Sequence, residues 1–432
     1  MTMNTSALLS GGFLVTVLSG VPIAFVLGIV SLTYLIFIGN TPIAIIGSYF
    51  FSGLNNASYV SLPFFILVGL LMTKTRITDD FIFLADMLVG RLPGSLAQIN
   101  ILVSILFAGI SGTAVADTAA MGSILIPMMK RQGYTAEYSA AITTASSVIG
   151  PIIPPSAIMV VYASVTDVPL GTLFVGGIMP GLLIGVGLMV MAMFFAIRDK
   201  HPRRRQPFVR ERARHAINRA GIGLLLAVII MAGLLSGVFI PSEAAVMACI
   251  YVIWMGCVVL KTLTVRDIAD SIAQAAVIAG AILLIVFSAH LFGIVLTSEG
   301  IPGKITEVIS SFAGNDFSFL ILVNLLFLFM GMIMEPSAFV VILAPILLPM
   351  ALASGIHPIH FSLVMIVNAN IGLATPPLGM CLFTVAPIAR VKYERIAIAA
   401  LPFLAMEIAV LMLITFFPDI ILWVPRATGL IV

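Results

Sequence analysis

Two acidic residues stand inside apolar tracts of the sequence. Asp117 lies in GISGTAVADTAAMGSILIPMM, residues 109–129, and Glu335 lies in MEPSAFVVILAPILLPM, residues 334–350. Ionisable groups inside a membrane are costly and are functional by default, with a structural partner or a protonated acid as the alternative. Serine, threonine and asparagine residues accompany both acids. A hard monovalent cation such as sodium favours neutral hydroxyl and carbonyl oxygens, so these residue types predict a cation site.

Glycine and proline interrupt the apolar sequence after each acid. Residues 150–155 read GPIIPP and residues 372–377 read GLATPP, and proline removes amide donors and breaks a helix. Broken backbone is tolerated at membrane depth only where it is buried in protein or lines a cavity. Free carbonyls at one helix end can coordinate a cation, and free amides at a helix start favour an anion. Each break therefore predicts a binding site, although small residues also line ordinary helix contacts.

A different chemistry is suggested by GISG, residues 109–112, which matches the Gly-x-Ser-Gly pattern of rhomboid-like intramembrane serine proteases. Such an enzyme needs a histidine on another span to activate Ser111, and His290 is the candidate. Breaks in both halves of the chain have no place in a protease. Ion binding without covalent chemistry is therefore the stronger interpretation, and we expect no catalytic residue.

Composition places the chain in a membrane. Of its 432 residues 61% are hydrophobic and 9% are charged, whereas soluble domains carry roughly 25% charged residues. At about 20 residues per crossing, the apolar blocks allow roughly ten spans, with the lipid bilayer as solvent. The net charge of +3 gives no sign of a nucleic-acid partner. The three cysteines lie in apolar blocks, as packing residues do.

The chain aligns with itself at a shift of 222 residues, without a gap. Glycine and proline, whose roles are set by backbone geometry, match in register over roughly seventy residues. This pattern predicts two related halves, residues 1–198 and 220–432, joined by a basic cytoplasmic loop at 199–219. The matching pairs are Gly109 and Gly331, Pro127 and Pro349, Gly133 and Gly355, Gly150 and Gly372, Pro154 and Pro376, Pro155 and Pro377, and Pro180 and Pro402.

Each half predicts a re-entrant helical hairpin followed by a broken helix. The hairpins are expected at 95–130 and 319–351, and the broken helices at 136–164 and 361–386. Limbs of about 16 residues rise about 24 Å, which is less than the roughly 30 Å hydrocarbon core. The other expected spans lie near 6–20, 22–38, 57–72, 170–197, 220–238, 244–260, 275–297 and 396–424, with amphipathic stretches at 77–94 and 301–316.

Positive charge sets the expected orientation. The nine Lys and Arg of residues 198–219 place that loop in the cytoplasm, and counting crossings outward puts both termini in the periplasm. Five crossings separate the hairpins, so the first opens to the cytoplasm and the second to the outside. The repeat is therefore inverted. Inverted repeats with broken helices are typical of secondary transporters, whose binding sites lie where the breaks meet.

The four quoted motifs resemble the large membrane subunit of tripartite ATP-independent periplasmic (TRAP) transporters. They are GISGTAVADTAAMGSILIPMM, SSVIGPIIPPS, EPSAFVVILAPILLPM and NANIGLATPPLGM, and the resemblance covers essentially the whole chain. It implies an all-α, elevator-type fold of the ion transporter superfamily in a bacterial inner membrane. It also implies sodium-driven uptake of an organic acid delivered by a periplasmic substrate-binding protein. A small membrane subunit completes such systems, and we expect it here as a separate chain.

The resemblance assigns site residues by matching segment. One sodium ion would bind at the first tip and break, at Ser111, Gly112, Thr113, Ser147, Gly150 and Pro154. A second would bind at Glu335, Pro336, Asn370, Gly372 and Thr375. Thr113 and Ser156 are expected to meet the substrate, and Asp117 is expected to support the first tip without touching sodium. A standalone carboxylate–sodium symporter of the same superfamily, which needs no binding protein, is the alternative.

Overall fold

The computed structural model is all-helical over the residues it describes, which are 16, 19, 21–39, 41–42, 45–48, 57–75, 77–201, 210–300 and 316–431. Side chains are not described at 57–58, 109–111, 210–216 and 316–317. Within the described ranges six helices are long and apolar enough to cross a membrane, or seven if one bent pair forms a single span. The chain is a multi-pass membrane protein.

The first half contains the bent pair and the first tip. Helices α4 and α5 meet at 73°, and α6 and α7 are separated by Gly112 and Thr113 alone. Gly112 has a φ of 65°, a left-handed conformation that glycine adopts without strain. The helices of this half are α2 (Ile23–Phe37), α4 (Ala57–Lys74), α5 (Ile77–Val89), α6 (Ser95–Ser111), α7 (Ala114–Arg131), α8 (Ala136–Ser147), α9 (Ala157–Thr166) and α10 (Leu170–Arg198).

The second half places its helices in a similar order. Only Met334 and Glu335 separate α15 from α16, and both helices pack against α17. The helices of this half are α11 (Arg210–Leu235), α12 (Pro241–Trp254) with a π-helical turn (Met255–Val259), α13 (Val265–Ser298), α15 (Asp316–Ile333), α16 (Pro336–Ala353), α17 (Pro358–Ala374), α18 (Met380–Ala389), α19 (Tyr393–Phe416) and α20 (Asp419–Ala427).

Helix starts in the two halves are separated by the same number of residues as the sequence shift. Helix α7 begins at Ala114 and α16 at Pro336, while α8 begins at Ala136 and α17 at Pro358. Each pair of starts is therefore 222 residues apart. Both breaks contain a cis proline bond, Pro154–Pro155 in one and Pro376–Pro377 in the other. The local backbone thus follows the same course in both halves at these points.

Three element bounds differ from the sequence expectations. Helix α11 begins at Arg210, inside the expected loop, because its Arg, Glu and Ala residues are good helix formers. The expected last span is two helices, α19 and α20, with Pro418 at the junction. Helix α17 continues past Gly372 to Ala374, so the second break comes later than GLATPP suggested. The expected arm at 301–316 and most of the first span lie outside the described residues.

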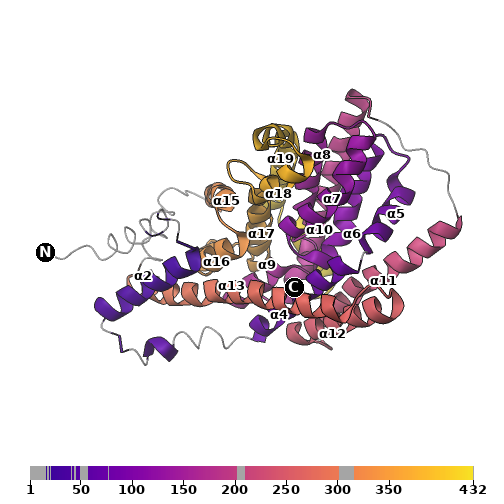
Figure 1. Cartoon of the computed structure of the whole chain (residues 1–432). Helices are drawn as coiled ribbons and strands as arrows, with labels where there is room; N and C mark the ends of the chain where they lie inside the picture. The colour runs from indigo at the N-terminus through magenta and orange to yellow at the C-terminus, as the bar shows by residue number, and fades with distance from the viewer. Residues whose placement is uncertain are drawn as a thin grey trace.

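The helices form two groups in space (Figure 1). Helices α2, α4, α12 and α13 lie across the lower part of the view and pack on one another as the pairs α2–α13, α4–α12 and α4–α13. Helices α6, α7, α8, α10, α17, α18 and α19 stand above them. The two groups meet where α4 packs on α9 and α13 packs on α16. We call the lower group the scaffold and the upper group, with α9, α15 and α16, the tip bundle.

Buried polar side chains tie each broken helix to the first helix of its hairpin. In the first half Asn100 of α6 donates to Thr143 of α8 at 2.7 Å and accepts from Ser146 at 3.2 Å. In the second half Asn368 of α17 donates to the side-chain oxygen of Asn324 on α15 at 2.9 Å. Hydrogen bonds satisfy these groups in a region without water. Ser146 and Asn368 are 222 residues apart, so the corresponding positions carry this contact.

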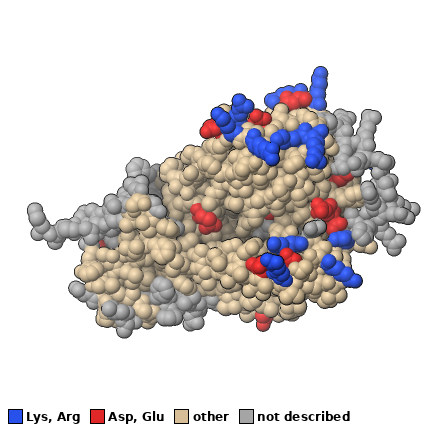
Figure 2. All heavy atoms as spheres, viewed as in Figure 1, with Lys and Arg blue, Asp and Glu red and all other residues tan. Residues whose placement is uncertain are grey.

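Charge is unevenly distributed over the surface. On the face drawn in Figure 2, Lys and Arg gather at the top and the right of the view, over the ends of the tip bundle and beside α11 and α12. Much of the remaining surface is apolar, as lipid contact requires. Among the buried side chains of the described residues there is no Lys or Arg. The basic residues therefore mark the edge of the apolar zone.

Candidate functional site

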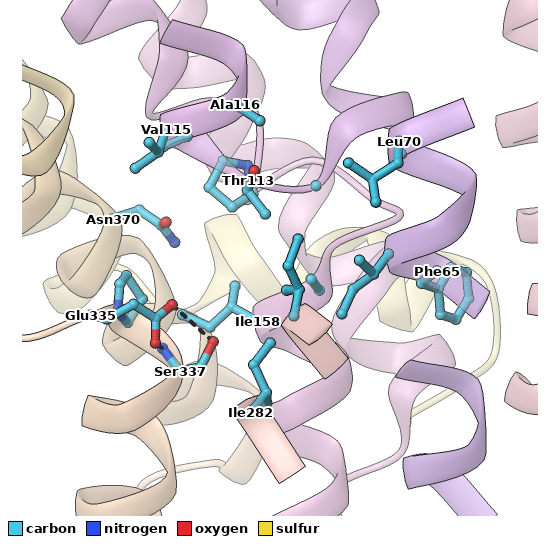
Figure 3. Close-up of a pocket in the computed structure, with 18 of the residues that line it drawn as sticks. Phe65, Leu70, Thr113, Val115, Ala116, Ile158, Ile282, Glu335, Ser337 and Asn370 are labelled. Carbon is cyan, nitrogen blue, oxygen red and sulfur yellow. Dashed lines mark hydrogen bonds between the residues drawn. The ribbon is translucent and has the colours of Figure 1, made fainter. Parts of the chain in front are cut away.

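A cavity of about 440 Å³ lies where the two tips and the two breaks meet. Thr113 enters it from the first tip, and Glu335 and Ser337 enter it from the second (Figure 3). Asn370 of α17 and Pro155 of the first break complete this side of the cavity. Segments more than 200 residues apart in the chain therefore converge on one space.

The opposite wall of the cavity belongs to the scaffold and is apolar. It consists of Phe65 and Leu70 on α4 and Ile278 and Ile282 on α13. Figure 3 shows Phe65, Leu70 and Ile282 across the cavity from Asn370. Polar groups thus line the tip bundle, while the scaffold offers a hydrophobic surface. An amphipathic organic molecule fits such a lining, since binding sites are mostly apolar with a few placed polar groups.

The polar tip residues are both helix N-caps. Thr113 precedes α7 and Glu335 precedes α16, each with extended backbone. The Glu335 carboxylate accepts from the backbone amides of Ser337 and Ala338 at 2.9 and 3.1 Å, and from the Ser337 hydroxyl at 3.0 Å. The partial positive charge of the α16 N-terminus favours the ionised carboxylate. Thr113 makes no side-chain cap on α7, so that helix turns its first amides toward the cavity without one.

The structure brings the first tip onto the first break. A methyl group at Gly112 would lie 3.3 Å from the Pro155 carbonyl oxygen and 3.3 Å from the Ala157 amide nitrogen. The hydroxyls of Ser147 and Thr118 are 2.6 Å apart, which fastens the end of α8 to α7. The predicted set Gly112, Thr113, Ser147, Gly150 and Pro154 therefore belongs to one local region. The side chain of Ser111 is outside the described residues, and its backbone ends α6.

Asp117 is buried in the first turn of α7 and points at the break. Its backbone amide donates to the Thr113 carbonyl at 3.1 Å. A methyl group at Gly150 would overlap the Asp117 carboxylate, so the carboxylate rests directly on the glycine backbone. The absence of a side chain at Gly150 is what admits the acid. Asp117 thus lies behind the first tip and does not line the cavity.

Ser156 is turned into the break. Its hydroxyl donates to the Pro151 carbonyl at 2.5 Å and accepts from the Met159 amide at 3.3 Å, which caps α9. Only 1% of the residue is exposed, and it does not line the cavity. Of the two residues expected to meet substrate, Thr113 therefore lines the cavity and Ser156 shapes the backbone beside it.

The second predicted set is more dispersed. Asn370 lines the cavity and donates its amide nitrogen to the Ile366 carbonyl at 2.8 Å, so its side-chain oxygen is the remaining acceptor. Thr375 ends α17, and its hydroxyl donates to the Ile371 carbonyl at 2.7 Å. Gly372 faces α15, where its Cα lies against the backbone of Gly331. Glu335 and Pro336 line the cavity beside Asn370.

Sequence reasoning did not single out several residues of this site. Ser337 follows Pro336 directly, and its place in the first turn of a capped helix was a usable signal. Thr118 adjoins Asp117 and was legible in the same way. The scaffold residues Phe65 and Ile282 gave no signal, because an apolar residue facing a cavity has the same type as one facing lipid.

A family model describes the same chain from its sequence. Residues 10–420 match the model of the "Tripartite ATP-independent periplasmic transporter, DctM component". The chain belongs to this family. It is therefore a TRAP transporter large permease subunit, which is a transport protein and not an enzyme, and the protease interpretation of Ser111 and His290 is set aside.

Curated relatives cover nearly the whole chain. The sialic acid TRAP transporter large permease protein SiaM of Vibrio cholerae serotype O1 is 34% identical, over 96% of this chain and 97% of its own length. The C4-dicarboxylate large permease DctM of Rhodobacter capsulatus is 33% identical, over 98% and 100%. The isethionate permease protein DctMQ of Oleidesulfovibrio alaskensis is 36% identical over 95% of this chain, which spans 65% of that protein.

A solved structure shares the fold. The YdaH transporter of Alcanivorax borkumensis, whose crystal structure is described as having an unusual topology, superposes with a TM-score of 0.64. The match covers 87% of each chain at 15% sequence identity. This TRAP subunit therefore has the same overall helical arrangement as a membrane transporter of distant sequence.

Proposed function

We propose that this chain is the large subunit of a sodium-coupled TRAP transporter that imports an organic acid anion. The observation that carries the proposal is the cavity, because two tips, two breaks and the scaffold meet there around Thr113, Glu335 and Asn370. Three relatives are named for sialic acid, isethionate and C4-dicarboxylates, all of which are organic acids. The anion would bind between the tips with its apolar part against α4 and α13.

Two sodium ions are proposed as co-transported cargo. The first would bind where the first tip meets the first break, among Ser111, Gly112, Thr113, Ser147, Gly150 and Pro154. The second would bind near Glu335, Pro336, Asn370, Gly372 and Thr375. Helix ends at both places offer carbonyl oxygens that lack helical partners. The buried Asp117 carboxylate supports the first position through Gly150 and adds negative charge behind it.

Transport would proceed by movement of the tip bundle against the scaffold, in an elevator mechanism on an inverted repeat. The cavity lies at the border of the two groups, and its scaffold wall of Phe65, Leu70 and Ile282 makes no polar contact that would resist sliding. The energy would come from mass action of the sodium gradient. Differential binding by the ions and the anion is what shifts such an equilibrium.

The proposed setting is a bacterial inner membrane with both termini in the periplasm. Contacts among basic residues agree with this orientation. Lys130 donates to the Ala389 carbonyl at 3.0 Å, and Arg395 lies 3.7 Å from Glu137. All four residues fall on the side assigned to the cytoplasm, so these contacts join helix ends at one membrane face. A periplasmic substrate-binding protein and a separate small membrane subunit would complete the system.

Reconstituted vesicles test the proposal. With the small subunit and the binding protein present, we expect uptake of the cognate organic acid that requires external sodium. Uptake that persists at full rate in sodium-free medium would refute the ion coupling. Uptake by this chain alone from free substrate would refute the tripartite requirement and support a standalone symporter. Asp117→Asn should weaken the sodium dependence, and normal transport by that variant would make the carboxylate structural.

A further inference from the structure

A second buried acid lies in the tip bundle away from the cavity. Glu407 of α19 has 0% of its surface exposed, and neither carboxylate oxygen has a hydrogen-bond partner among the described residues. It belongs to the face of α19 that also carries Phe403 and Leu411, one turn to either side. This acid is not part of the proposed sodium sites and has no acidic counterpart at the 222-residue shift, where Gly185 stands.

The surroundings of Glu407 contain no cation. Helix α19 packs against α8, α10, α17 and α18, and none of the buried side chains described is a Lys or an Arg. The charged residues Glu137, Arg198 and Arg390 stand at the ends of these helices. The titratable groups on their buried faces are Tyr138 of α8, whose ring lies 5.8 Å from that of Phe403, His360 of α17, which bonds the Ile414 carbonyl at 2.9 Å, and Cys381 of α18.

The nearest negative charge opposes ionisation of Glu407. Cys381 is close enough to both Asp117 and Glu407 to interact with each electrostatically. Two ionised carboxylates in one low-dielectric bundle repel each other. An isolated buried carboxylate is also far more costly than a buried neutral acid, because it loses its hydration without gaining a partner. His360 is engaged seven residues further along α19, about 10 Å along the helix axis, and does not compensate.

We propose that Glu407 is a proton-binding site, at which a held proton keeps the carboxyl neutral while the tip bundle works. The neutral acid lets α19 pack against α8 and contributes no charge to the moving bundle. The proton is retained through the cycle and is not a coupling ion. Glu407 therefore differs from Asp117 and Glu335, which sit at helix starts where the dipole favours a charge.

Infrared spectroscopy of the reconstituted protein tests the proposal directly. The wild type should show the carbonyl stretching band of a protonated carboxylic acid at neutral pH, and Glu407→Gln should lose that band. Glu394→Gln is the matched control, since Glu394 is an exposed acid at the start of the same helix. It should leave the band in place. A wild-type spectrum from which Glu407→Gln removes no such band would overturn the proposal.

Transport of charge gives a second readout. Glutamine resembles the neutral acid, so Glu407→Gln should retain uptake within about twofold of the wild type. The charge moved per substrate, taken from reversal potentials, should be the same in both proteins. A folded Glu407→Gln protein that has lost uptake, or that moves one charge more or fewer per substrate, would show that Glu407 acts as an ionised or exchanging group.

Discussion

The crossing of α15 and α17 gives the sharpest test of how this fold is packed. The two helices touch through Gly331 and Gly372. A methyl group at Gly372 would lie 2.6 Å from the Gly331 Cα and 2.7 Å from its carbonyl oxygen, both of which are backbone atoms that cannot rotate away. A methyl group at Gly331 would lie 3.3 Å from its nearest neighbours on α17. The same substitution therefore meets very different space on the two helices.

We expect Gly372→Ala to destabilise the protein and Gly331→Ala to be nearly neutral. For Gly372→Ala, α15 must move by about 0.8 Å to restore ordinary contact at 3.4 Å. Overpacking of this kind costs about 1–3 kcal/mol, and the better helix propensity of alanine returns at most about 1 kcal/mol. Gly331→Ala gains the same propensity and needs only a shift of about 0.1 Å to reach 3.4 Å.

The assay is thermal unfolding of the purified variants in detergent, followed by sodium-dependent uptake after reconstitution. Gly372→Ala should melt at lower temperature than the wild type and should need more sodium, because Gly372 belongs to the proposed second sodium site. Gly331→Ala should match the wild type in both measurements. Equal melting temperatures for the two variants would refute the backbone contact, and equal sodium dependence would separate Gly372 from the ion site.

Three further predictions follow from other contacts. Gly150→Ala should lower the melting temperature by displacing the Asp117 carboxylate, whereas Gly171→Ala, with nothing within 4 Å of the added methyl group, should not. Glu335→Ala should cost about 0.5–2 kcal/mol of stability through the lost cap, while Glu335→Gln should keep the melting temperature nearer the wild type and raise the sodium requirement of uptake; unchanged sodium dependence in Glu335→Gln would contradict its role at the ion site. Removing the ion pair of Arg219 with Asp80, 3.0 Å apart and near the surface, by Arg219→Met should change stability by at most about 1 kcal/mol, and a larger loss in thermal unfolding would assign that pair a structural role.

Much of this architecture was legible in the residues. Apolar composition predicted a multi-pass membrane protein, and the family motifs predicted a TRAP large subunit; both are confirmed. The glycines and prolines at the 222-residue shift pointed to the places where helices begin and end, because those two residue types are set by backbone geometry. Helix α11 was misjudged as a loop from Arg210 onward, because its charge was weighed and its helix propensity was not.

The convergence of the site could only come from tertiary structure. Sequence spacing placed Thr113 and Glu335 at equivalent positions, but their meeting in one cavity depends on how the two halves pack. The apolar wall on α4 and α13 has the composition of any lipid-facing helix, so no local pattern marks it. The same holds for Glu407, since an acid in a span reads alike whether it is paired, charged or neutral. Its burial without a partner is a property of the packed bundle, where long-range contacts and the low dielectric decide its state.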